Sequence, residues 1–200
     1  MKKNPARKTV AAVLGGIAAA LVLIAIAVLP RLEHLAPAEP SIGGPFTLVD
    51  QTGKTVSDAD YRGKLMLIYF GYTFCPDVCP TSLGVLSKAL DMLTPKELAQ
   101  VAPIFITVDP ERDTVEQMAQ YVGAFHPALQ GLTGSPEQVQ AAIKAYRVYA
   151  KRSEGEANTP NYTMDHSSIL YLMGKDGKFI AHYGHTASAQ DIAEGVKKHL

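Results

Sequence analysis

Twenty consecutive uncharged residues, from Val10 to Leu29, impose the strongest constraint on this chain. Alanine, valine, leucine and isoleucine dominate them, and an α-helix of about 20 such residues crosses the roughly 30 Å hydrocarbon core of a bilayer. The apolar core of a cleaved signal peptide is shorter, at about 7–15 residues. We therefore expect residues 10–29 to form a retained transmembrane anchor rather than a cleaved leader.

Charge sets the expected orientation of that anchor. Residues 1–9 carry four basic and no acidic side chains, and positive charge favours the cytoplasmic side. We expect these nine residues in the cytoplasm and everything after Pro30 outside. Both cysteines of the chain lie beyond the span, in a compartment that tolerates disulfides.

The rest of the chain divides into a linker and one domain. Proline is frequent between Pro30 and Pro45, which is typical of a linker, here assigned to residues 30–42. Residues 43–200 suffice for a single hydrophobic core. Five of the 19 basic residues lie in residues 1–31, which have no acidic residue, so the remainder carries 14 basic and 19 acidic side chains. A mildly acidic domain is not expected to bind nucleic acid or anionic lipid.

Alternating hydrophobic segments predict an α/β fold. Continuous apolar runs at Leu65–Tyr72 and Pro103–Val108 predict strands buried on both faces, and helical spacing connects them from Pro80 to Leu93. The other expected elements are a hairpin of Phe46–Val49 with Thr55–Val56, a helix capped by Asp113 with Glu116 and ending near His126, a strand at Leu129–Leu132, a helix capped by Ser135 with Gln138 and ending near Tyr146, an extended segment at Arg147–Lys151, a hairpin of Ser167–Met173 with Lys178–Tyr183, and a helix capped by Ser188 with Asp191. This order predicts a sheet that is parallel in its middle and antiparallel at an edge.

The two cysteines, Cys75 and Cys79, lie where the first buried strand gives way to a helix. Functional loops of open α/β sheets occupy that place. In helical geometry the two side chains share a face about 6 Å apart, and the positive end of the helix lowers the pKa of a thiol. The same separation also allows a disulfide, so the pair alone leaves metal binding and thiol exchange open.

A histidine ligand would favour a metal. His166 comes just before a hydrophobic strand, where its loop can face the cysteine loop; a purely structural role is the alternative. The other histidines are His34, His126, His182, His185 and His199. Two thiolates and an imidazole suit Cu(I) and also accept Cu(II), whereas catalytic zinc with a bound water stays open. Asp77 and Asp165 lie nearby, and we interpret them as loop-capping carboxylates.

Longer motifs surround these three residues. They are Tyr69–Thr73 leading into Cys75–Pro80, Thr107–Thr114, Leu132–Gly134, Tyr146–Tyr149 and Asp165–His166. Through them the chain resembles, from about Gly43 onward, the Sco/SenC family of copper-binding cytochrome c oxidase assembly proteins. The resemblance implies a thioredoxin-like central mixed sheet flanked by helices, behind one N-terminal transmembrane helix, with copper bound by Cys75, Cys79 and His166.

The resemblance also implies a function. It is that of a metallochaperone or thiol reductant, which delivers Cu(I) or Cu(II) to, or reduces, the CuA site of cytochrome c oxidase subunit II. Other periplasmic copper or thiol-redox proteins are further expected partners. Because nine residues before the span are few for a transit peptide, we expect a single-pass protein of the bacterial inner (cytoplasmic) membrane with a periplasmic domain. The mitochondrial inner membrane is the alternative.

Three other functions would use the same residues. A metal-free thiol-disulfide oxidoreductase would cycle Cys75 and Cys79, and this is the enzymatic activity to expect if the chain is an enzyme. Thioredoxin-type enzymes, however, space their cysteines by two residues and place a proline where this chain has His166. A thiol peroxidase needs two thiols in different environments. A copper or redox sensor would need a regulated partner that the sequence does not name.

Overall fold

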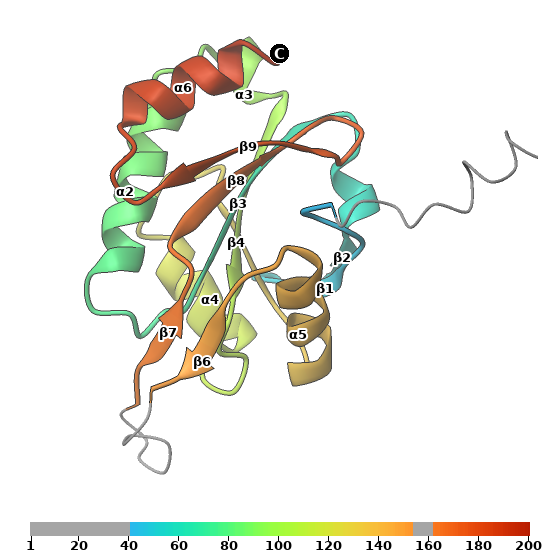
Figure 1. The fold of residues 1–200 in the computed structure, drawn as a ribbon, viewed down its shortest axis with the longest axis vertical. Coiled ribbons are helices and arrows are strands. Elements are labelled where there is room, and N and C mark those ends of the chain that lie inside the picture. Colours follow the sequence, from blue (N-terminus) through green and yellow to red (C-terminus); the bar gives the residue numbers. More distant parts are fainter. Residues whose placement is uncertain (1–40, 154–161) are drawn as a thin grey trace, which may run out of the picture. The chain divides into compact units, whose positions relative to one another are not determined.

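The computed structural model describes residues 41–153 and 162–200, and they belong to one compact unit (Figure 1). The expected cytoplasmic segment at 1–9, the anchor at 10–29 and most of the linker at 30–42 lie outside the described residues. Within the described ranges, the helices are all too short or too polar to cross a bilayer.

A seven-stranded mixed sheet runs through the described unit, in the order β2-β1-β5-β4-β3-β8-β9 (Figure 1). The strands are β1 (Thr47–Asp50), β2 (Thr55–Ser57), β3 (Leu65–Gly71), β4 (Val101–Thr107), β5 (Gln130–Thr133), β8 (Ile169–Met173) and β9 (Phe179–Gly184). Strands β3, β4 and β5 are parallel, as predicted. Antiparallel strands flank them on both sides, whereas the sequence predicted such strands at one edge.

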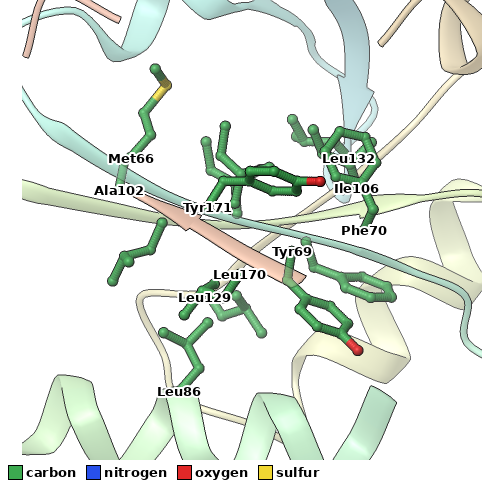
Figure 2. Close-up of a cluster of buried hydrophobic side chains, with 14 of the residues drawn as sticks. Met66, Tyr69, Phe70, Leu86, Ala102, Ile106, Leu129, Leu132, Leu170 and Tyr171 are labelled. Carbon is green, nitrogen blue, oxygen red and sulfur yellow. The ribbon is translucent and has the colours of Figure 1, made fainter. Parts of the chain in front are cut away.

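The two central strands fold as their composition requires. All seven residues of β3 and all seven of β4 are buried, and the strands pair in register with Ile68 opposite Ile104. Side chains alternate between the faces of a strand. Figure 2 shows the result: Tyr69 lies on the same side of the sheet as Leu86, and Phe70 lies on the other. Each face of β3 therefore packs against a different layer of the core.

Helices cover both faces of the sheet. They are α2 (Val78–Asp91), α3 (Pro95–Leu98), α4 (Val115–Val122), α5 (Pro136–Ala145) and α6 (Ala189–Lys197), with a 3-10 turn η1 (Asp58–Tyr61). Helices α2, α4 and α6 lie on the Tyr69 side and α5 lies on the Phe70 side (Figure 1). The predicted capping boxes of α5, at Ser135, and of α6, at Ser188, are confirmed. This arrangement leaves the end of β3 free to present a loop.

The predicted cap of α4 is wrong. Thr114, not Asp113, caps the helix, because its hydroxyl accepts a hydrogen bond from the Gln117 N–H at 3.3 Å. Asp113 is fully buried and its carboxylate accepts hydrogen bonds from residues outside the helix. The helix also ends at Val122, earlier than the sequence indicated.

A second, two-stranded sheet was not predicted. It consists of β6 (Ala150–Arg152) and β7 (Met164–His166), which pair antiparallel with Ala150 opposite His166. Strand β6 starts later than the expected extended segment because Arg147 has a positive φ of 54°. Figure 1 places this ribbon beyond the end of the main sheet at which β3 leads into α2.

Candidate metal centre

Three side chains from three elements meet at the end of β3. Cys75 lies in the loop after β3, Cys79 in the first turn of α2, and His166 at the end of β7. Their ligand atoms all lie within 4.8 Å of one another. Within residues 41–153 and 162–200, no other three such side chains approach this closely. The structure thus brings together the three predicted site residues, and no other described histidine joins their group.

The β6–β7 ribbon and two tyrosines hold His166 in place. On the chain after it, the Ser167 N–H donates to the Tyr149 carbonyl at 2.9 Å, which fastens the end of β7 to the ribbon. The imidazole stands edge to face against Tyr69 and Tyr72, with interplanar angles of 88° and 89°. A ring packed in this way reaches the cysteines without losing freedom on binding a metal.

The hydrogen bonds of His166 indicate its tautomer. Its Nδ1 lies 3.2 Å from the carbonyl oxygen of Ser167, which can only accept, so Nδ1 carries the proton. Its Nε2 lies 3.3 Å from the Cys79 Sγ and has its lone pair directed at the site. Metal-binding histidines commonly donate their second N–H to a carbonyl in this manner. His166 therefore has the form that a metal ligand requires.

The two thiols have opposite electrostatic environments. A hydrogen bond from the Cys79 thiol lowers the pKa of Cys75, and the hydrogen bond from the Cys79 N–H acts in the same direction against the effect of burial. That N–H lies 3.4 Å from the Cys75 Sγ, at the positive end of α2. The same bond, with Cys79 as donor, raises the pKa of Cys79, and burial adds to it. At neutral pH the pair holds one thiolate and one thiol.

Alkylation should report this asymmetry. Cys75 is 8% exposed and Cys79 is 0% exposed, so iodoacetamide should modify Cys75 first. Because the pKa of Cys75 is lowered, we expect its rate in the reduced, metal-free protein to change less than about threefold between pH 8 and pH 6. An ordinary thiol with a pKa of about 8.5 slows about 80-fold over that range. A decline of that size, followed by mass spectrometry of the modified peptide, would contradict the assignment.

Gly71 permits the close approach of α2 to β3. A Cβ at this position would lie 2.7 Å from the Cys79 Sγ and 2.9 Å from the Phe105 ring. Contacts below 3.0 Å force neighbouring atoms to move. The absence of a side chain at Gly71 is therefore what allows Cys79 to sit against the strand.

An open hollow of about 400 Å³ leads to the site. Its lining includes Cys75 and His166, together with Asp77, Met164 and Asp165. Asp77 accepts a hydrogen bond from the Thr81 hydroxyl of α2 at 3.4 Å, and Asp165 accepts one from the Ser153 hydroxyl at 3.3 Å. Cys79 is fully buried and is not among the residues that line the hollow.

The donor set fits copper by its chemistry. Thiolate sulfur is a preferred ligand of Cu(I), and imidazole also accommodates Cu(II). Among the described residues, the group of close potential ligands has three members, and a backbone carbonyl and aromatic rings surround His166. Structural zinc usually takes four protein ligands.

Comparison with known proteins assigns the chain to a family. The SCO1/SenC family model matches residues 35–200. The chain belongs to the SCO1/SenC family. It is 43% identical over 160 residues to the mitochondrial SCO1 homolog 1 of Arabidopsis thaliana, an alignment that covers 80% of this chain and 47% of that protein. The chain spans about half the length of the curated relatives it matches.

Solved structures of the SCO1/SenC family share the fold. ScoI of Bradyrhizobium japonicum, solved with copper bound, is 46% identical, with a TM-score of 0.74, covering 80% of this chain and 100% of that one. BsSco, described as having a disulfide switch and as a member of the Sco family of cytochrome c oxidase assembly proteins, is 28% identical, with a TM-score of 0.64, covering 81% and 94%. The expected thioredoxin-like mixed α/β fold is confirmed.

The motif Thr107–Thr114, one of those that carried the resemblance, has a structural explanation in this SCO1/SenC chain. Arg112 donates to Asp109 at 2.5 Å and to the Tyr162 carbonyl at 2.8 Å, and its guanidinium lies 4.8 Å from the centre of the Phe74 ring. The Tyr162 hydroxyl donates to Asp109 at 2.6 Å. Since Phe74 precedes Cys75 and Tyr162 precedes β7, this network connects the loop that carries Cys75 to the segment that leads into β7 and His166.

Asp113 holds the loop that leads to Cys75 in place through hydrogen bonds. Its carboxylate accepts hydrogen bonds from the Thr73 N–H at 3.0 Å, the Thr73 hydroxyl at 2.7 Å and the Thr107 hydroxyl at 2.6 Å. Burial raises the pKa of Asp113, and these hydrogen bonds oppose the rise. Sequence reasoning missed this role because Asp113 and Glu116 have the spacing of a helix cap, whereas the cap lies one residue later, at Thr114 with Gln117.

Removal of the Asp113 carboxylate should destabilise the domain. In Asp113→Ala the Thr73 N–H and the Thr107 hydroxyl lose their partner, and we expect the free energy of unfolding in urea to fall by about 3 kcal/mol. The matched control is Glu111→Ala, because that side chain is 64% exposed and forms one surface ion pair with Arg152. Its expected effect is below about 1 kcal/mol. Equal effects of the two substitutions would contradict the proposed support.

The other histidines have ordinary surroundings. His126 accepts from the Ala128 N–H at 3.1 Å and lies 3.7 Å from Asp91. His182 stacks on Phe179. The described histidines other than His166 belong to no close group of three potential ligands, and His34 lies outside the described residues. Tyr69, Tyr72 and Gly71 are functional neighbours that sequence reasoning did not single out, although all three stand in the motif that carried the resemblance.

Proposed function

We propose that this chain is a membrane-anchored copper metallochaperone that binds Cu(I) and Cu(II) through Cys75, Cys79 and His166. The observation that carries the proposal is the convergence of their three ligand atoms within 4.8 Å at the end of β3. The copper-bound structure of the similar Bradyrhizobium japonicum protein supports copper as the metal. Copper here is cargo, which the protein acquires and passes on.

The site is arranged both to bind copper and to release it to a partner. Cys75 already holds a thiolate, so copper binding displaces the proton of Cys79 alone, and affinity should rise with pH until that thiol is deprotonated. Cys75 and His166 face the hollow, whereas Cys79 is closed off behind them. An incoming partner ligand can therefore reach the copper only from the Cys75 and His166 side.

The proposed acceptor is the CuA site of cytochrome c oxidase subunit II. Support comes from the description of BsSco as a member of a family of cytochrome c oxidase assembly proteins. Other periplasmic copper or thiol-redox proteins are proposed as further partners.

Thiol reduction is the second candidate function. The observation that favours it is the adjacent thiolate and thiol, which is the arrangement that attacks a partner disulfide and then resolves the mixed disulfide. The disulfide switch described for BsSco supports it as well. Both functions can belong to one cycle, because copper loading requires reduced cysteines.

We further propose that residues 10–29 anchor the chain in the bacterial inner membrane, with the domain in the periplasm. The apolar length of the segment and the preceding basic residues support this orientation. Alkaline phosphatase fused after Leu200 should be active in a bacterial host. An inactive fusion would place the domain in the cytoplasm and exclude this topology.

Copper transfer tests the proposed function. The full chain in detergent is loaded with copper and mixed with a reduced, copper-free soluble domain of subunit II. We expect the visible spectrum of CuA to develop in the acceptor, and no transfer from a His166→Ala preparation exposed to the same copper. A parallel sample mixes the metal-free, reduced chain with the same acceptor domain in its disulfide form. If that disulfide becomes reduced while the reduced acceptor gains no copper, the thiol-reductant function is correct and the metallochaperone function is not.

A further inference from the structure

The hydroxyl of Tyr69 is a buried polar group without an assigned role. Tyr69 is 2% exposed, and among the described residues no group meets strict hydrogen-bond geometry with its hydroxyl, although the side chains of Ser82, Ser168 and Cys79 lie near it. Buried donors are almost always paired, and those left over tend to have a functional or solvent-mediated role. The groups that surround the Tyr69 hydroxyl therefore indicate its role.

Strand alternation directs Tyr69 at the metal centre. Figure 2 shows Tyr69 on the side of the sheet where Leu86 of α2 lies. Gly71, two residues further along β3, shares this face by strand alternation. The point where a Gly71 Cβ would stand lies 2.7 Å from the Cys79 Sγ and 3.1 Å from the Tyr69 ring, so the ring and the sulfur are immediate neighbours. The same ring lies edge to face with His166, at 6.3 Å between centroids. Tyr69 thus contacts the surroundings of two of the three ligands.

We propose that the Tyr69 hydroxyl donates a hydrogen bond to the Cys79 sulfur and thereby tunes the copper bound there; the inference rests on the proposed copper function. Tyr69 is a positioning residue, because it acts on copper through Cys79. Hydrogen bonds to a ligating sulfur adjust the electronic properties of copper sites.

Tyr121 is a poorer candidate for donating a hydrogen bond to the Cys79 sulfur. The Tyr121 hydroxyl is also buried without a partner, but the Tyr121 ring packs between Phe105 and Phe125, at 5.3 Å from each. A cavity of about 20 Å³ next to Tyr69, lined also by Ser82 and Ser168, has room for about one water molecule. The rival to our inference is therefore that water, or the hydroxyl of Ser82 or Ser168, satisfies the Tyr69 hydroxyl.

Tyr69→Phe separates the hydrogen bond from the packing. The substitution keeps the ring against His166 and removes the oxygen. A hydrogen bond withdraws electron density from the sulfur, so its loss should move the thiolate-to-Cu(II) charge-transfer band of the copper-loaded protein to longer wavelength. We also expect the Cu(I) affinity to fall about 10-fold, as for other partners of metal ligands.

Tyr171→Phe is the matched control. Tyr171 is a buried tyrosine of β8 on the opposite face of the sheet, where its ring packs against Phe70 and Tyr146. It should lose a hydroxyl without any change in the band. An unchanged band and affinity in Tyr69→Phe, with copper bound normally by the wild type, would overturn this inference alone. Failure of the wild-type protein to bind copper would instead overturn the proposed function.

Discussion

His166→Ala is expected to bind Cu(I) more than about 100-fold more weakly than the wild-type protein, a loss beyond the range seen when only an outer partner of a ligand is removed. The imidazole is the nitrogen ligand of the site, and no other described histidine lies close enough to replace it. Competition with a Cu(I) chelator under anaerobic conditions measures the change.

His182→Ala provides the control for that substitution. His182 stacks on Phe179 away from the ligand group, so its removal should leave the Cu(I) affinity unchanged. Cys75→Ser and Cys79→Ser should match or exceed the loss in His166→Ala, because each removes a thiolate. Wild-type affinity in any of the three ligand variants, with the fold verified by circular dichroism, would exclude that residue as a ligand.

Gly71→Ala is expected to have the largest effect on Cu(I) affinity among substitutions that leave the ligands intact. The added methyl group would stand 2.7 Å from the Cys79 Sγ, with the Phe105 ring at 2.9 Å on another side. We expect the free energy of unfolding to fall by about 1–3 kcal/mol from overpacking. The Cu(I) affinity should fall more than about 10-fold, because the displaced sulfur no longer faces His166.

Gly84→Ala is the matched control. Gly84 lies in α2 like Cys79, but an added Cβ there meets no atom within 4 Å. Since alanine is the better helix former, this variant should be more stable by about 0.5–1 kcal/mol and should bind copper normally. Urea denaturation and chelator competition on both variants give the comparison. A Gly71→Ala protein with wild-type stability and affinity would show that the strand end tolerates a side chain.

The central part of the fold was predictable from sequence because its signals are local. The apolar run at Leu65–Tyr72 can only be buried on both faces, and the helical spacing from Pro80 to Leu93 predicted α2, which begins two residues earlier, at Val78, and so includes Cys79. The capping boxes at Ser135 and Ser188 were readable for the same reason. Each of these elements is defined by residues within one or two turns of chain.

The position of the third ligand, His166, beside the two cysteines was not predictable from local sequence patterns. Strand β7 has three residues, and its position depends on pairing with β6 across a polar loop. Its place before a hydrophobic strand made His166 a candidate ligand with a structural role as the alternative, and the resemblance to a family implied that it is the ligand. Asp113 misled the analysis because an aspartate before a helix usually caps it, whereas here Thr114 takes the cap and the carboxylate supports Thr73.

X-ray absorption spectroscopy of the Cu(I)-loaded protein tests the central claim most directly. The full chain, reduced and loaded anaerobically with one equivalent of copper, should show a first coordination shell of two sulfur atoms and one nitrogen atom, the latter with the outer-shell scattering of an imidazole. The nitrogen contribution should disappear in His166→Ala. A shell without sulfur, or one without imidazole in the wild-type protein, would contradict a copper site formed by Cys75, Cys79 and His166.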